Sequence, residues 1–176
     1  MSKLIPFLLS CLAFTQAAFP WEGRSVDLGS SLRKADLVAR VKIVSVANAP
    51  ADSGFRQLAR ATITDAVKGM KQGENIDLLS DNGYVCPNVI YKVGDDCIVF
   101  AMRRKSGHFE TMYTYAGLFR LENGAAECHL LADLDHELYR GTFKEIEAKV
   151  RHKYQAEEIL AVLRRHLSTN EAVPPK

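Results

Sequence analysis

Between residues 37 and 121, apolar and polar residues alternate along several short segments of the chain. The first is Leu37–Val46, in which Arg40 and Lys42 lie on the polar side of the alternation. The apolar positions are Leu37, Ala39, Val41 and Ile43. A period of two is typical of a β-strand with one buried face. We therefore predict a strand over Leu37–Val46, followed by a loop over Ala47–Gly54.

The same pattern predicts further strands and one strand of a different kind. A second strand over Leu58–Val67 has an apolar face made of Ala59, Ala61, Ile63 and Val67. The other predicted segments are Asn75–Ser80, a short extended piece at Val89–Val93, Phe109–Tyr115 and Leu118–Leu121. Nearly every residue of Asp96–Met102 is apolar, which predicts a strand covered on both faces. Asn123-Gly124 is a hairpin-turn signal.

Helical spacing appears at the two ends of this region. Ser25–Ala35 predicts a short helix that ends at Asp36. Near the C-terminus, Thr142–Glu145 has the sequence of a capping box. Two apolar stripes follow, one containing Phe143, Ile146, Val150 and Tyr154, the other Ala156, Ile159, Leu160, Leu163 and Leu167.

The two C-terminal stripes are out of phase by about 130° at 100° per residue. One straight helix cannot bury both against a single surface, so we predict a bend or break near His152–Gln155. The alternative is a continuous helix whose second half binds a partner.

This order of elements predicts an α+β fold. We expect a small five-stranded, OB-like β-barrel with a short N-terminal helix and C-terminal helices. The predicted organisation is a signal peptide over 1–17, the barrel domain over 18–141, a helical segment over 142–170 packed on or beside the barrel, and a flexible tail over 171–176.

The N-terminus has the layout of a secretory signal peptide. A positive start at Lys3 precedes the apolar run Leu4–Phe14, and Ala17 or Ala18 offers the cleavage site. The apolar run is too short for a membrane span, which needs about 20 residues. Leu8–Cys11 resembles a lipobox, so lipidation at Cys11 is the alternative. We expect a secreted or periplasmic protein without a membrane span.

The expected export determines which cysteines remain in the mature chain and allows them to form a disulfide. Cleavage removes Cys11 and leaves Cys86, Cys97 and Cys128 in an oxidising compartment. Cys97 lies in the predicted two-sided strand, where a thiol is a small hydrophobic group of poor reactivity. We expect a disulfide between Cys86 and Cys128, which lie in loop-like and turn-like sequence. The two other pairings and the fully reduced state are the alternatives.

Composition narrows the function classes. The chain has 176 residues, 47% of them hydrophobic, and its 23 basic and 21 acidic residues give a net charge of +2. A nucleic-acid binder that tracks phosphates concentrates basic charge, so we expect no nucleic-acid partner. Gly-x-Ser-x-Gly, His-Glu-x-x-His and phosphate-loop motifs do not occur in the sequence, and we expect no catalytic residues and no cofactor.

Two clusters carry candidate chemistry. Arg103, Arg104 and Lys105 follow the two-sided strand directly and form the densest basic cluster of the barrel segment. With the second helical stripe around Leu160, they are the candidate binding surface. The segment Asp133–Glu137 contains weak candidate metal ligands, Asp133, Asp135 and His136. Its spacing matches no known metal-binding loop, and an exposed polar connection is the simpler interpretation.

Four stretches carry a family resemblance: KADLVARVKIVSV, ARATITDAVKG, VGDDCIVFAM and YAGLFRLENG. Their pattern resembles secreted bacterial proteins with the OB-type barrel of tissue inhibitors of metalloproteinases and netrin-like (NTR-like) modules. The resemblance spans about Leu32 to Leu131 and implies the barrel fold. In those inhibitors an N-terminal cysteine chelates the zinc of the target. Here the expected mature chain has no cysteine before Cys86, so zinc chelation is not implied.

We therefore interpret the chain as a secreted or periplasmic, non-enzymatic module that binds or inhibits another protein. Its expected partner is another envelope or extracellular protein. The alternative is a metal-dependent protein or enzyme that uses Asp133–Glu137. A housekeeping envelope protein without a ligand of its own is a third interpretation.

Overall fold

A computed structural model describes residues 28–83, 88–112, 117–127 and 153–171. It contains two helices, α1 (Leu28–Lys34) and α3 (Ala156–Glu171), among these residues. The strands are β1 (Leu37–Asn48), β2 (Gln57–Lys68), β3 (Asn75–Ser80), β4 (Asp96–Arg103), β5 (Phe109–Thr111), β6 (Leu118–Arg120), β7 (Ala125–Glu127) and β8 (Lys153–Gln155). The order and most of the bounds agree with the alternation in the sequence.

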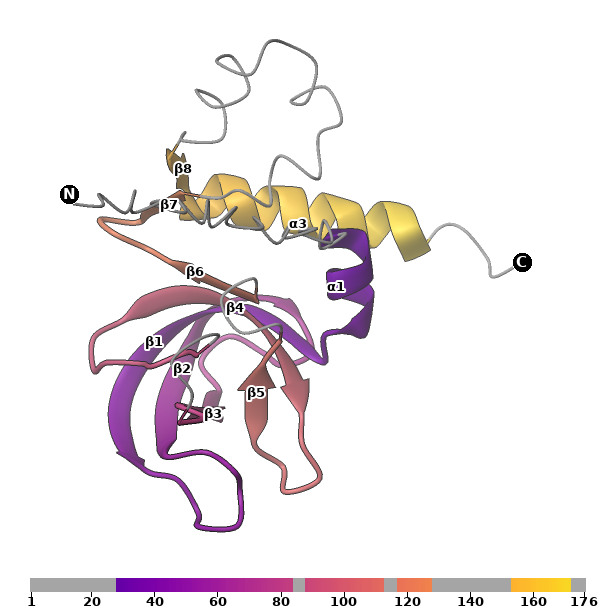
Figure 1. Cartoon of the computed structure of the whole chain (residues 1–176). Helices are drawn as coiled ribbons and strands as arrows, with labels where there is room; N and C mark the ends of the chain where they lie inside the picture. Colours follow the sequence, from indigo (N-terminus) through magenta and orange to yellow (C-terminus); the bar gives the residue numbers. More distant parts are fainter. Residues whose placement is uncertain (1–27, 84–87, 113–116, 128–152, 172–176) are drawn as a thin grey trace, which may run out of the picture.

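Five strands close into a barrel (Figure 1). The order is β1-β2-β3-β5-β4, and β4 pairs with β1 to complete the ring. All pairs are antiparallel except β3 with β5. The predicted α+β fold with a small five-stranded barrel is confirmed. β6 continues along the same edge of β4 as β5.

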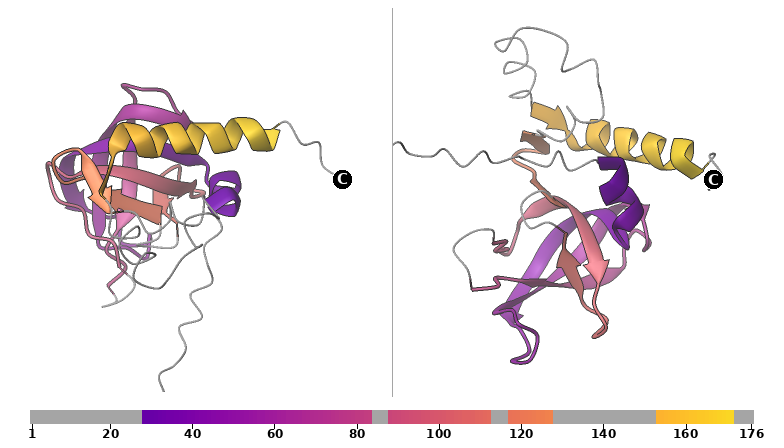
Figure 2. Two further views of the ribbon diagram at one scale, coloured as in Figure 1. Left: turned by 90° about the horizontal axis from the view of Figure 1, so that it is seen from above. Right: turned by 45° about the vertical axis from the view of Figure 1, so that its right-hand side comes forward.

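Both helices lie on one side of the barrel. Figure 2 shows α3 crossing over the strands, with α1 beside it. The small sheet β7–β8 leads directly into α3. The loop between β1 and β2 and the hairpin between β4 and β5 project from the opposite end of the barrel (Figure 1).

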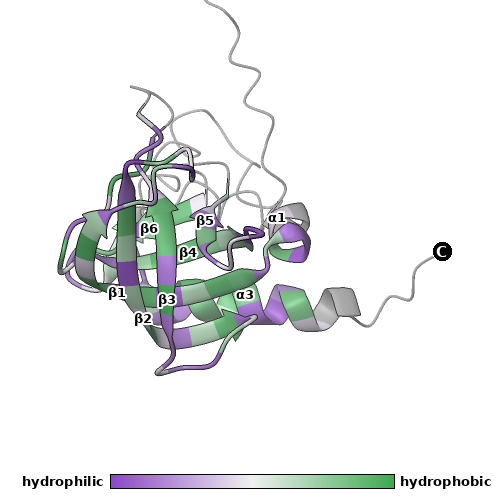
Figure 3. Ribbon diagram, turned by 90° about the horizontal axis from the view of Figure 1, so that it is seen from below, coloured by the Kyte–Doolittle hydropathy of each residue, from purple (hydrophilic) through white to green (hydrophobic). Residues whose placement is uncertain are grey.

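The protein has two apolar cores, and β4 separates them. The barrel interior contains Cys97, Val99 and Ala101 of β4, and the core beneath the helices contains Ile98 and Phe100. The prediction that this strand is covered on both faces is confirmed. The apolar face predicted for β1 also lies inside the barrel. Hydrophobic and hydrophilic positions along the strands are coloured in Figure 3.

The apolar face predicted for the strand Leu58–Val67 is wrong at its C-terminal end. Ile63 pairs with Val41 and Asp65 pairs with Arg40, so Thr64 is an extra residue in β2. A bulge of this kind reverses the faces of the residues that follow it. Val67 therefore packs against the core beneath the helices and not in the barrel interior.

Local contacts fix the ends of the helices. Lys68 Nζ donates to the carbonyl oxygens of Leu32 (2.9 Å) and Arg33 (3.0 Å) in the last turn of α1. Such a cation satisfies carbonyls that have no partner within the helix. At α3, the side chain of Glu158 accepts from the backbone N–H of Gln155 at 2.9 Å, as in a capping box.

The predicted break in the C-terminal helix is confirmed, and the continuous helix is wrong. Lys153–Gln155 form β8 and α3 begins at Ala156. The second stripe packs on the molecule itself, since Leu160 is 1% exposed and belongs to the core beneath the helices. Leu160 therefore presents no surface to a partner in this structure.

Candidate binding cleft at the loop end of the barrel

The end of the barrel opposite the helices contains a cleft of about 520 Å³. We call this region the loop end and define it by the 49–56 loop and the 104–108 hairpin. Pro50, Asp52 and Ser53 line one wall of the cleft, and Leu79 of β3 also lines it. The hairpin contributes Arg104, Lys105, Ser106 and His108.

The hairpin is tightly closed. The backbone N–H of Arg104 donates to the carbonyl of His108 at 2.8 Å, and that of Gly107 donates to the carbonyl of Arg104 at 2.9 Å. Gly107 has a φ of 88°, a left-handed conformation that favours glycine. The Ser106-Gly107 turn that the sequence indicates is therefore present. It holds Lys105 and His108 at fixed positions on a rigid strand pair.

The 49–56 loop is also held by its own polar groups. The Ser53 hydroxyl donates to the Pro50 carbonyl at 2.6 Å and accepts from the Phe55 N–H at 3.2 Å. At its base, the Ala49 N–H donates to the Arg56 carbonyl at 3.1 Å. A loop with this internal bonding loses little conformational entropy on binding a ligand.

Arg104 connects the two walls. Its guanidinium forms an ion pair with Glu110 of β5 and lies over the Phe55 ring, 5.8 Å from the ring centroid. The side chain therefore bridges the hairpin and the 49–56 loop by charge and by a cation–π contact.

Arg103 is directed to other neighbours. Its guanidinium lies 4.7 Å from the centroid of the Phe109 ring and 3.8 Å from the sulfur of Met70. Its backbone N–H donates to the Asp36 carboxylate at 2.7 Å. Arg103 is absent from the cleft lining.

Lys105 is the member of the predicted basic cluster that remains available. It is exposed and lines the cleft, and no ion pair joins it to another described residue. His108 lies nearby, with Nδ1 3.0 Å from the Ser106 hydroxyl oxygen. Sequence reasoning missed Asp52, Ser53, Phe55 and Glu110. The loop signal at 47–54 marked the first two, but nothing local in the sequence places that loop opposite the hairpin.

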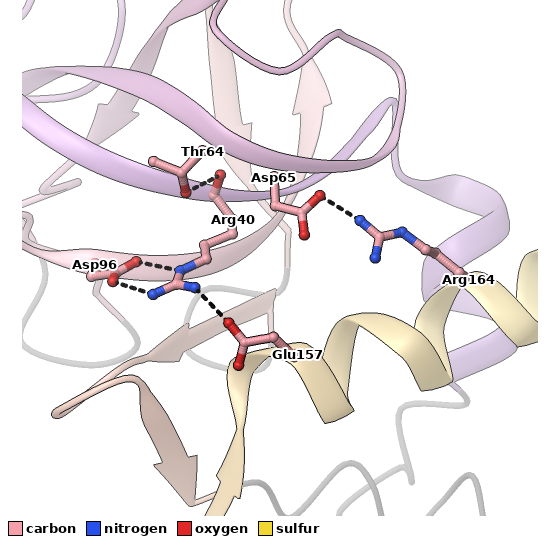
Figure 4. Close-up of polar contacts among 6 residues, drawn as sticks. All are labelled: Arg40, Thr64, Asp65, Asp96, Glu157 and Arg164. Carbon is pink, nitrogen blue, oxygen red and sulfur yellow. Dashed lines mark hydrogen bonds and ion pairs between the residues drawn. The ribbon is translucent and has the colours of Figure 1, made fainter.

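The charged residues on the helix side pair with one another (Figure 4). The Arg40 guanidinium donates to both carboxylate oxygens of Asp96, at 3.0 and 2.8 Å, and to Glu157 of α3 at 3.2 Å. The hydrogen bond with Asp96 raises the pKa of Arg40. Arg164 of α3 pairs with Asp65 of β2. These contacts attach α3 to the barrel.

The barrel interior is unsuited to thiol chemistry. Cys97 is fully buried, and desolvation raises the pKa of its thiol to about 12. Burial also raises the pKa of Tyr91, whose hydroxyl oxygen lies 2.6 Å from that of Thr111. A neutral, buried thiol is a poor nucleophile, as its place in an apolar strand predicts.

Several predicted residues lie outside the described part of the chain. They are the signal segment 1–17, the disulfide cysteines Cys86 and Cys128, and the acidic cluster with Asp133, Asp135 and His136. Across the described ranges, no group of three or more His, Cys, Asp or Glu side chains is arranged to hold a metal ion. Neither described helix is long and apolar enough to cross a membrane.

Comparisons of the chain with models of protein families, with curated proteins and with solved structures found no match.

Proposed function

We propose that the protein is an exported, non-enzymatic module that binds another protein of the envelope or extracellular space through the loop end of its barrel. The observation that carries this proposal is the cleft between the 49–56 loop and the 104–108 hairpin. The signal-peptide layout of the N-terminus supports export. The strand pattern that resembles inhibitor and netrin-like barrels supports a binding role.

The physical basis is a preorganised surface on a rigid support. Arg104 fixes the two walls through Glu110 and Phe55, so binding does not have to order them. Lys105 and His108 then offer hydrogen-bond donors, and the exposed ring of Pro50 offers apolar contact. A few polar groups in a partly apolar cleft are typical of recognition sites.

The proposal is tested by capturing partners of the mature protein from periplasmic extract and culture medium of the cells that make it. Wild type is compared with Lys105→Glu, which reverses charge in the cleft, and with Lys92→Glu, which makes the same change at an exposed lysine outside it. A rim charge acts mainly on association, and we expect Lys105→Glu to weaken binding about tenfold. Lys92→Glu should bind like wild type. Equal recovery by all three proteins, or no partner at all, would contradict the proposal.

A further inference from the structure

Two charged side chains that line the loop-end cleft have no ion pair or side-chain hydrogen bond with any described residue. They are Asp52 in the 49–56 loop and Lys105 in the hairpin, and both are exposed. Arg104, the third residue of the lining with a permanent charge, pairs with Glu110. The cleft therefore presents one free negative and one free positive charge, contributed by opposite walls.

Tight turns hold both charged residues at defined positions. The Ser53 N–H donates to the Pro50 carbonyl at 3.0 Å, which closes a β-turn around Asp52. A backbone hydrogen bond of 2.9 Å between the ends of the 104–107 turn encloses Lys105 in the same way. The cation–π contact between the two walls keeps the turns together. The backbone of each residue is therefore in place before a ligand binds.

The two charges do not neutralise each other. No ion pair joins Asp52 and Lys105, although both line the same cleft of about 520 Å³. A ligand with a positive and a negative group can pair with both residues. A ligand of one sign gains one attraction and meets one repulsion. Charge complementarity therefore favours a ligand that carries both signs.

The exposure of both side chains favours a segment of a protein over a free zwitterion. An ion pair in contact with solvent raises affinity by about fivefold at most. Two such pairs cannot offset the translational and rotational freedom that a free small molecule loses on binding. A segment of a folded partner undergoes this loss once for its whole interface, and the partner surface around the segment adds further contact.

We propose that the loop-end cleft binds a partner segment with an acidic and a basic side chain close together. The acidic side chain pairs with Lys105 and the basic one with Asp52. This inference rests on the proposed function and adds the charge pattern of the partner. It also sets the direction of the segment, because the reverse direction would bring like charges together.

The first test reverses each charge separately. A random decapeptide library displayed on phage is selected on the mature protein at low salt, where multivalent display retains weak binders. We expect the enriched peptides to carry both signs. The binding of these peptides, made synthetically, should fall about tenfold in Asp52→Lys and in Lys105→Glu. Thermal unfolding of each variant shows that it is folded.

Matched reversals outside the cleft are the controls. Glu122→Lys changes a carboxylate that is 81% exposed, and Lys92→Glu changes an exposed lysine. Neither residue lines the cleft. Both variants should bind the enriched peptides like wild type.

The second test exchanges the charges on both sides. The double variant Asp52→Lys/Lys105→Glu keeps the net charge of the cleft and reverses its direction. It should bind the selected peptides about 100-fold more weakly than wild type, because the two losses add. A peptide whose acidic and basic residues have changed places should bind the double variant as the original peptide binds wild type. A purely structural role of Asp52 or Lys105 would not produce this rescue.

Three results would overturn the inference: no enriched peptide, enriched peptides of a single sign, or no rescue by the exchanged peptide. Binding of a captured partner separates this inference from the proposed function. If Lys105→Glu weakens that binding and Asp52→Lys leaves it unchanged or tightens it, the loop end binds the partner but the two-sign pattern is wrong. If neither variant changes the binding, both proposals are wrong.

Discussion

The helix side and the loop end of the barrel use charged residues in different ways. On the helix side, Arg40 and Arg164 bond to carboxylates on neighbouring elements and attach α3 to the strands. At the loop end, Arg104 is paired in a similar way, but Lys105 projects beside an open cleft. The same kind of side chain thus contributes to stability at one end and is available for recognition at the other. Substitutions of Arg40 and Lys105 test this contrast in charge directly.

The largest effect is expected from Leu160→Ala on the helix side. Leu160 of α3 is fully buried in the core between the helices and the barrel, and loss of such a side chain costs about 3 kcal/mol of unfolding free energy. Urea denaturation measures this value. Ala161→Ser, at the exposed neighbouring position, should change stability by less than about 0.5 kcal/mol. An unchanged stability of Leu160→Ala would place the residue on a surface and remove the contrast.

The next largest loss of stability is expected at alkaline pH, through the buried thiol of Cys97 in the barrel interior. The folded state raises the pKa of Cys97 from 9.0 to about 12. Above pH 9 the unfolded chain loses this proton and the folded chain keeps it, so stability falls as pH rises. From pH 7 to pH 10 the expected loss is about 1.4 kcal/mol. The difference in unfolding free energy between wild type and Cys97→Ala, measured at both pH values, isolates the contribution of this thiol. A pH-independent difference would show that water reaches the thiol.

A smaller loss is expected from Arg40→Ala. The substitution leaves Asp96, whose side chain is 24% exposed, without its bidentate partner. Because the pair is partly solvated, the expected loss is about 1 kcal/mol. Arg60 makes a matched bidentate contact with Asp77 but is 58% exposed, so Arg60→Ala should cost less. Urea denaturation of both variants measures the difference, and equal losses would show that burial beside α3 adds nothing.

The smallest effect on stability is expected at the loop end. Lys105→Glu removes no ion pair or side-chain hydrogen bond with another described residue, so its unfolding free energy should stay within about 0.5 kcal/mol of wild type. Thermal unfolding of both proteins checks this. A loss of stability comparable to that of Arg40→Ala would show that Lys105 stabilises the fold, as Arg40 does.

Much of the fold follows from local sequence. The alternation in β1 and the unbroken apolar run of β4 are sufficient to predict a barrel wall with covering helices. The bulge at Thr64 could not be predicted, because the residue sits in a regular alternation and the extra position appears only in the pairing with β1. The burial of Leu160 against the barrel could not be predicted either, since an apolar stripe has the same sequence whether it packs on its own barrel or on a partner.

Only part of the candidate site could be predicted from the sequence. The three members of the basic cluster are adjacent in sequence, but they have different neighbours because of contacts distant in sequence. Arg104 lies over Phe55, which is far along the chain, and Arg103 lies near Met70. Sequence spacing cannot predict either neighbour. It therefore could not show that Lys105, rather than the arginines, is the available cation.

The central claim is that partners dock at the loop end. The most direct measurement is photo-crosslinking of the mature protein, with a benzophenone amino acid placed at the exposed cleft position Ser106, which keeps Asp52 and Lys105 in place, or, as the control, at the exposed position Ala161 on α3. Mass spectrometry then identifies adducts formed in periplasmic extract and medium. We predict one dominant protein adduct from position 106 and none from position 161. Adducts from position 161 alone would contradict the claim and move the binding surface to the helices.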